Sequence, residues 1–215
     1  NVLEQPFVAI HLATKELARL GRMALGMIVS AQKAFIGNDS VAVREVMVTE
    51  ETVDELHGKI LNYLSAMVAN DTNTGEQGTA ISGLMHVAAD IEHIGDHCKN
   101  IAEFADSKIK KSYEFSEEAY AEIYSCFDLA KKMTGDSIDA LENGDPEKAG
   151  GVREMETEMN IMEGELRQRH MVRLTQKKCS PEFTVIYTDV IHDIEKIGDY
   201  CDNIANVIIE NHSVE

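Results

Sequence analysis

Two segments of the chain repeat one pattern of acidic side chains. Residues 90–103 read DIEHIGDHCKNIAE and residues 193–206 read DIEKIGDYCDNIAN, so ten of fourteen positions agree at a constant offset of 103. Side chains four residues apart are neighbours on a helix, and two carboxylates at that spacing destabilise it by about 0.2–0.5 kcal/mol. A bound cation is a reason to keep such a pair. The repeated pairs are Glu92 with Asp96 and Glu195 with Asp199.

Carboxylates on a second helix of each half extend the pattern. Residues 41–68 hold Glu50 and Asp54, and the matching positions at an offset of 106 are Glu156 and Asn160. Carboxylates from two helices of a bundle can hold divalent or trivalent metal ions, and bridging oxygens make a multinuclear cluster feasible. The predicted metal ligands are Glu50, Asp54, Glu92, Asp96, Glu156, Asn160, Glu195 and Asp199, with Asp90, His93, His97, Asn100, Asp193 and Asn203 as a second tier. Mixed carboxylate and imidazole ligands favour Fe, Mn or Zn over Ca²⁺.

The same residues have a simpler explanation, which is contact with water. Acids four apart on a long helix usually form a solvated face, and this fits Glu50 and Asp54 when they are taken alone. The repeated acids recur in register with Asn100 and Asn203, which favours a function for them. Four other histidines are predicted to be ordinary surface or boundary residues: His11, His57, His170 and His212.

A glycine recurs inside each repeated segment, as Gly95 and Gly198. Glycine in a helix interior costs about 1 kcal/mol relative to alanine. We expect another helix to approach closely at both positions.

The elements that position these residues are predicted to be helices throughout. The chain has only three prolines and no tryptophan, and long stretches show apolar residues at helical spacing. The first three helices are expected at about 4–34, 41–68 and 76–110. The fourth is expected to begin at 116 and the fifth at 146, and the sixth is expected to end at about 210. Residues 37–40 predict a turn followed by an N-cap, and Pro146 suits a first helical turn.

The duplication covers nearly the whole chain. The repeat unit is three helices, so the predicted fold is all-α, with two tandem three-helix bundles at residues 1–111 and 112–215. If the two bundles pack side by side with a pseudo-two-fold relation, they bury apolar faces that a single bundle would expose to water.

Charge and composition limit the partners. A net charge of −18 argues against nucleic acid and anionic membrane surfaces, so cations are the expected ligands. No apolar run is long enough to span a bilayer and no signal-peptide pattern is present, which predicts a cytoplasmic protein without direct membrane insertion. The four cysteines form no CxxC pair, and Cys98 and Cys201 share an apolar stripe, which predicts buried reduced thiols.

At residues 90–103, and more loosely at 193–206, the sequence resembles the PhoU family, whose third and sixth helices carry a DLERIGD…NIAE pattern. The resemblance implies a regulator of bacterial phosphate uptake that works with a phosphate transporter or its membrane domain, and acidic motifs that bind multinuclear metal clusters. It implies ligand roles for Glu92, Asp96, Glu195, Asp199, Glu50 and Asp54. Asn160 departs from the family pattern where an acid is expected, and His93 and Lys196 replace the usual arginine. We therefore expect a weaker second site or one with fewer ions.

The segment 5–10, QPFVAI, with Glu16 and Arg19 after it, also resembles the start of the PhoU-like domain that follows the membrane part of bacterial sodium/phosphate cotransporters. This resemblance implies a piece of a longer protein, associated with the membrane through a transporter. Met-rich and Ala-rich helix faces further suggest a homo-oligomer or a docked membrane partner.

Two other functions compete with metal-dependent regulation. One is a helical interaction scaffold without metal, and the other is a carboxylate-bridged metalloenzyme. Such enzymes use a Glu-x-x-His spacing from paired helices. No such pair lies beside the repeated acids, so the expectation is a regulatory protein without enzymatic activity.

Overall fold

The computed structural model describes residues 6–69 and 75–212. Within these ranges the chain forms helices and connecting turns with no strand. The helices are α1 (Pro6–Gly37), α2 (Ser40–Val68), α3 (Gly75–Lys110), α4 (Glu117–Asn143), α5 (Pro146–Thr175) and α6 (Glu182–His212). The all-α prediction is confirmed. The expected start of the first helix at Glu4 lies outside the described residues.

The turn that joins the first two helices of each half has the same geometry in both halves. Asn38 and Gly144 have φ values of 54° and 61°, in the left-handed region where Gly and Asn end helices. The next residue caps the following helix in each case. Asp39 accepts hydrogen bonds from the backbone of Val41 and Ala42, and Asp145 accepts one from Lys148. Pro146 occupies the first turn of α5, as predicted.

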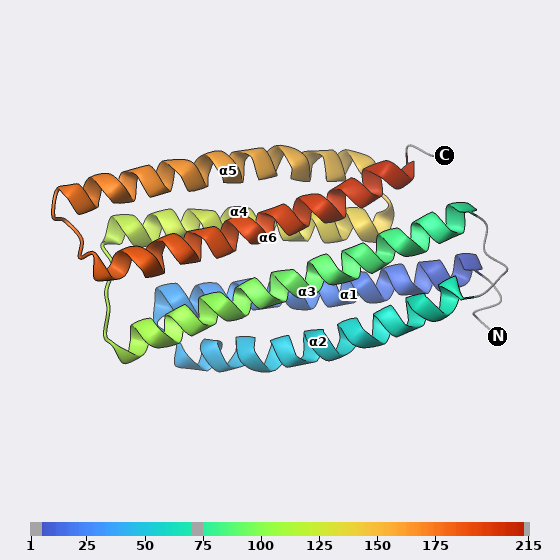
Figure 1. Cartoon of the computed structure of the whole chain (residues 1–215), viewed down its shortest axis with the longest axis horizontal. Coiled ribbons are helices and arrows are strands. Elements are labelled where there is room, and N and C mark those ends of the chain that lie inside the picture. The colour runs from blue at the N-terminus through green and yellow to red at the C-terminus, as the bar shows by residue number, and fades with distance from the viewer. Residues whose placement is uncertain (1–5, 70–74, 213–215) are drawn as a thin grey trace.

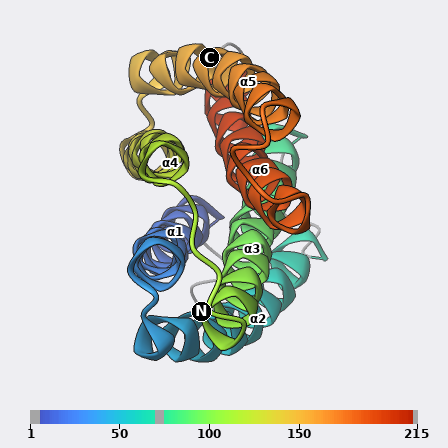
Figure 2. The ribbon, with the colours of Figure 1, turned by 90° about the vertical axis from the view of Figure 1, so that its left-hand side faces the viewer.

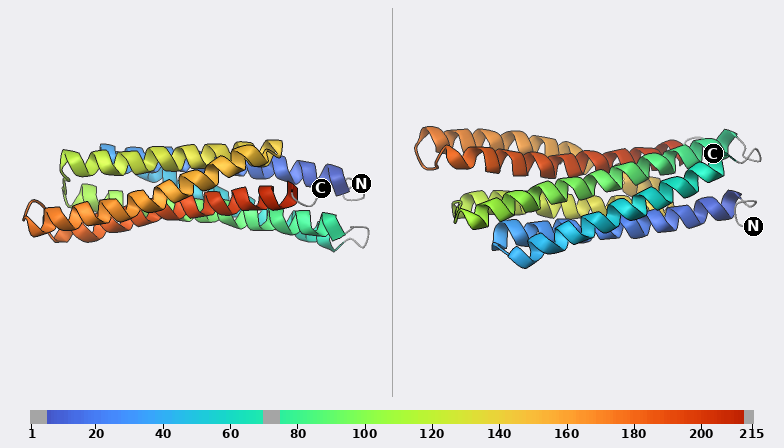
Figure 3. Two further views of the ribbon diagram at one scale, coloured as in Figure 1. Left: turned by 90° about the horizontal axis from the view of Figure 1, so that it is seen from above. Right: turned by 60° about the horizontal axis from the view of Figure 1, so that its bottom comes forward.

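The six helices run along the long axis of the molecule (Figures 1 and 3). Helices α1, α2 and α3 form one bundle, and α4, α5 and α6 form the other. The bundles meet through α1 against α4 and through α3 against α6, while α2 and α5 lie on opposite outer sides (Figure 2). The helices that carry the repeated motif therefore lie side by side at the centre.

The apolar stripe of the motif is buried in both copies. Ile91, Ile94, Cys98 and Ile101 are at most 1% exposed, and so are their counterparts Ile194, Ile197, Cys201 and Ile204. These side chains belong to one continuous core that crosses both repeats. The prediction of buried reduced thiols holds for Cys98, Cys126 and Cys201, while Cys179 is half-buried.

Polar contacts between α3 and α6 reveal the pseudo-two-fold relation. The Asn100 amide donates to the Asp193 carboxylate across 3.3 Å. The Asn203 amide donates to the Asp90 carboxylate across 3.2 Å. Each contact becomes the other when the 103-residue offset is applied, so each motif helix binds the other in the same way.

Each glycine of the motif faces side chains from the other two helices of its own bundle. A Cβ added at Gly95 would lie 3.6 Å from a methyl of Val53 and 3.7 Å from the end of Met27, which are ordinary contact distances. At Gly198 it would lie 3.3 Å from Met133 and 3.4 Å from Met159. The expected close approach of another helix is therefore wrong for Gly95, where only side-chain atoms come near, and Gly198 is tight against methionine side chains alone.

Within residues 6–69 and 75–212, no helix has the combination of length and hydropathy that crossing a membrane requires.

Candidate metal centre

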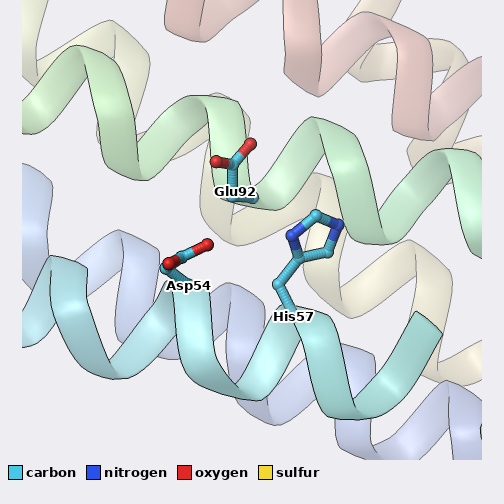
Figure 4. A group of neighbouring side chains, drawn as sticks. All are labelled: Asp54, His57 and Glu92. Atoms are coloured by element: carbon cyan, nitrogen blue, oxygen red, sulfur yellow. The ribbon is translucent and has the colours of Figure 1, made fainter. Parts of the chain in front are cut away.

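Two facing helices of the first repeat bring three metal-type ligands together. Asp54 and His57 lie on α2 and Glu92 lies on α3, and the three side chains gather between the helices (Figure 4). One ligand atom from each lies within 4.8 Å of the others. Asp54 is exposed, while His57 and Glu92 are half-buried, so the group stands at the edge of the core with one side open to solvent.

A second group shares Glu92 and lies along α3. Its other members are His93 and Asp96, again with ligand atoms within 4.8 Å of one another. His93 Nδ1 lies 3.0 Å from a Glu92 carboxylate oxygen. Across the described ranges these are the two groups of three or more such ligands, and Glu92 is the residue they have in common.

The electrostatics of Glu92 favour a positive partner. Its pKa is raised, first by desolvation on burial and then by the nearby Asp96 carboxylate, with a smaller contribution from Asp54. The neighbouring His93 and His57 act in the opposite direction. A bound cation would offset both the desolvation and the repulsion, because it stabilises the ionised form.

His57 presents one ring nitrogen to the two carboxylates. In Figure 4 this is the nitrogen bonded to the ring carbon that carries the side chain, Nδ1, while Nε2 lies on the far side of the ring. Nε2 is buried, and no hydrogen-bond partner for it lies in the described part of the chain. Neutral imidazole with carboxylate is a common ligand set for Fe, Mn and Zn. The donor atoms of the first repeat therefore fit such an ion.

Glu50 is bound elsewhere. Its carboxylate accepts a hydrogen bond of 3.0 Å from the Lys99 ammonium, and it belongs to neither ligand group. The hydrogen bond to Glu50 is the main cause of the raised pKa of Lys99. To act as a ligand, as the sequence predicts, Glu50 would have to leave this ion pair.

The second repeat arranges the equivalent positions differently. The Lys196 ammonium lies 2.6 Å from Asp199 and 3.4 Å from Glu195. On α5 the Asn160 amide donates to Glu156. No group of three metal-type ligands forms here among the described residues.

The second tier of predicted ligands lies mainly between α3 and α6. Asp90 and Asn203 bond each other, as do Asn100 and Asp193. His97 Nδ1 lies 2.7 Å from Asp193, whose side chain is nearly buried. These residues join the two repeats and belong to neither ligand group, whereas His93 belongs to the second.

Of the four histidines predicted to be ordinary surface or boundary residues, His57 is half-buried, as a boundary residue is, whereas His170 is buried. His57 belongs to the ligand group on α2, and its spacing of three residues after Asp54 is the signal that could have found it. His170 is 2% exposed, contacts the Thr184 hydroxyl across 3.1 Å and stacks on Tyr187. His11 and His212 are exposed, as expected.

Comparison with known proteins finds one family. The sequence profile described as PhoU domain matches residues 17–105 and 123–208. A protein of Thermotoga maritima named phosphate-specific transport system accessory protein PhoU homolog 1 is 24% identical over 172 residues, covering 80% of this chain and 73% of that protein. The PhoU homolog of Rhizobium meliloti is 24% identical over 201 residues, covering 91% of this chain and 81% of that one.

Solved structures agree on the fold. PhoU from Pseudomonas aeruginosa matches with a TM-score of 0.92 at 18% identity, covering 98% of this chain and 100% of that one. The phosphate transport system regulatory protein PhoU from Streptococcus pneumoniae matches with a TM-score of 0.86 at 18% identity, covering 98% of each chain.

Proposed function

The chain belongs to the PhoU family, and from this premise we propose that it regulates a phosphate transport system through a metal ion held between α2 and α3. The relatives named above are accessory proteins of phosphate-specific transport, which supports a component of such a system as the partner. The proposed role is regulatory and not enzymatic.

The observation that carries the metal part of the proposal is the convergence of Asp54, His57 and Glu92, whose ligand atoms lie within 4.8 Å of one another between two helices. We assign these three side chains as the primary ligands, with His93 and Asp96 next to them. Fe, Mn or Zn is the expected ion, because the donors mix imidazole with carboxylate. A bound ion would neutralise the clustered carboxylates and tie α2 to α3.

A regulatory consequence follows from which helices the ion would join. Helix α3 contacts α6 of the other repeat, whereas α2 is an outer helix that packs mainly on α1 and α3. An ion between α2 and α3 would therefore change how firmly an outer surface is held to the centre. A transport partner that contacts α2 could then bind the metal-loaded and metal-free proteins with different affinity.

The test is metal content and unfolding of protein purified without chelator and without a histidine tag. We expect the parent to bind Fe, Mn or Zn, and to gain about 2.7 kcal/mol of stability at a free metal concentration of 100 Kd. Glu92→Gln should remove most of this gain, because both ligand groups contain Glu92. Glu51→Gln, an exposed change on α2, is the matched control and should leave the gain intact. A parent that binds none of the three metals would contradict the metal part of the proposal.

A further inference from the structure

We propose that Lys196 takes the place of the metal in the second repeat, so that the chain holds a metal ion in the first repeat only. The half of this inference that concerns the first repeat rests on the function proposed above. The half that concerns the second repeat rests on its own contacts.

The ammonium of Lys196 lies where a cation between the repeated acids would lie. Its Nζ atom is 2.6 Å from an Asp199 oxygen and 3.5 and 3.4 Å from the two oxygens of Glu195. The Glu and Asp that the motif duplicates therefore already share one positive charge. Lysine has an ordinary pKa near 10.4 and is charged at neutral pH.

The matching residue of the first repeat cannot do the same. His93 stands at the position of Lys196, and its ring contacts Glu92 through one nitrogen at 3.0 Å. A neutral imidazole can itself ligate a metal ion, whereas an ammonium has three donors and no acceptor. One substitution thus turns a ligand into a competitor.

The ligands on the outer helix are also changed. Asn160 replaces Asp54 and donates its amide to Glu156. Glu163 stands at the position of His57, and its carboxylate is bound by Arg167. The positions that supply the first-repeat group from α2 are therefore either uncharged or already paired on α5.

Tethering makes the ammonium a strong competitor. Because Lys196 is on the same helix as both acids, its effective concentration at their oxygens is fixed by geometry and does not fall on dilution. A metal ion would have to displace the Lys196 ammonium from the two carboxylates. The displaced ammonium would stay close to the metal ion, and the two positive charges would repel each other. We therefore expect the second repeat to exclude metal ions that the first repeat binds.

The experiment measures bound Mn²⁺ per chain and asks where it resides. In the parent, Glu92→Gln should reduce bound Mn²⁺ to background. Adding Lys196→Met and Asn160→Asp to that variant should restore binding, now in the second repeat. Lys110→Met, which removes an exposed lysine from its pair with Asp106, is the matched control and should restore nothing.

A reciprocal change tests the same idea in the first repeat. His93→Lys should place an ammonium beside Glu92 and cause loss of most of the bound Mn²⁺, whereas His11→Lys on the exposed face of α1 should not. Circular dichroism and thermal unfolding in chelator check that each variant folds.

The outcomes separate this inference from the proposed function. If Glu92→Gln leaves half of the Mn²⁺ bound, the second repeat binds metal despite Lys196, and the inference is overturned. The metal site proposed for the first repeat is then still supported, because the other half of the Mn²⁺ is lost. If the parent binds none but the Lys196→Met, Asn160→Asp variant does, the role of Lys196 is supported and the first-repeat site is wrong. If neither binds, both are overturned.

Discussion

The two repeats fill equivalent core positions with different chemistry near one end of each bundle. In the first repeat these positions are apolar and buried: Leu64, Met67 and Leu84. In the second they are polar and buried: His170, Arg173 and Tyr187. The backbone positions match at the repeat offsets, so the same helical frame supports both solutions.

Two of these polar side chains, Arg173 and Tyr187, bind Glu122. Arg173 donates from both terminal nitrogens to its two oxygens at 2.9 and 2.6 Å, and the Tyr187 hydroxyl donates to one of them. The counterpart of Glu122 is Glu16, which is exposed and pairs with Arg19 on the surface. The comparison teaches that three equivalent positions stay buried while their chemistry changes, and that the second repeat also buries a carboxylate whose counterpart is exposed.

The largest difference in stability between the two repeats is expected when one partner of the buried pair between Glu122 and Arg173 is removed. Arg173→Met removes the bidentate cation of the buried Glu122 and leaves only the more distant Arg169, at 3.9 Å, so we expect the free energy of unfolding to fall by about 3–5 kcal/mol. Arg19→Met removes the exposed counterpart pair and should change stability by less than about 0.5 kcal/mol. Urea denaturation of both variants measures the difference. Equal effects would show that the Glu122 pair behaves as a surface pair.

Replacing both partners should recover what the single change loses. Glu122→Leu together with Arg173→Met replaces both charges with apolar side chains, and Met is the residue that the first repeat has at the position of Arg173. Replacing a buried ion pair with packed apolar groups is often neutral or stabilising by about 1–4 kcal/mol. A double-mutant cycle in urea gives the coupling energy. A double variant as unstable as Arg173→Met alone would mean that apolar side chains do not pack at these two positions.

The effect of Arg173→Met should depend on pH. Burial alone would raise the pKa of Glu122, but hydrogen bonds from Arg173 and Tyr187 outweigh it and hold that pKa below its ordinary value of 4.5. A depressed folded-state pKa gives stability that is present above pH 4.5 and lost as pH falls through the folded-state pKa. The gap between parent and variant should therefore be largest near pH 7 and narrow below pH 4.5. Unfolding at pH 7 and pH 4 measures it, and a constant gap would count against the assigned pair.

The smallest expected difference concerns the paired contacts between α3 and α6. Asn203→Ala removes the hydrogen bond to Asp90 and should cost about 1 kcal/mol. Asn100→Ala should cost less, because His97 still contacts Asp193 at 2.7 Å. Thermal unfolding of the two variants side by side measures the contrast. A larger loss for Asn100→Ala would reverse our ranking of the two contacts.

Much of the fold can be predicted from the sequence, because the repeat shows which helices of the two halves are equivalent. The 103-residue offset identifies the motif helices, and Asp145 with Pro146 marks a helix start by local chemistry alone. The apolar stripe containing Ile91 follows from helical period, and its burial is confirmed.

The site is only partly readable, because its contacts join different helices. Sequence spacing places Glu92 and Asp96 on one face, but it does not reveal that His57 of α2 meets Glu92. Nor does it reveal that Asn100 meets Asp193, since that requires knowing which helices of the two bundles touch. The ligand roles themselves remain predictions.

The crossed Asn and Asp pairs have the form of an isologous dimer interface, in which one surface binds a copy of itself. A free dimer of one three-helix unit would carry every substitution on both faces at once. Here the units are joined in one chain, so one copy has His97 where the other has Tyr200, and an imidazole joins only the Asn100–Asp193 pair. Because both halves lie in one chain, a substitution in one half need not appear in the other, and His93 in one half stands where Lys196 stands in the other.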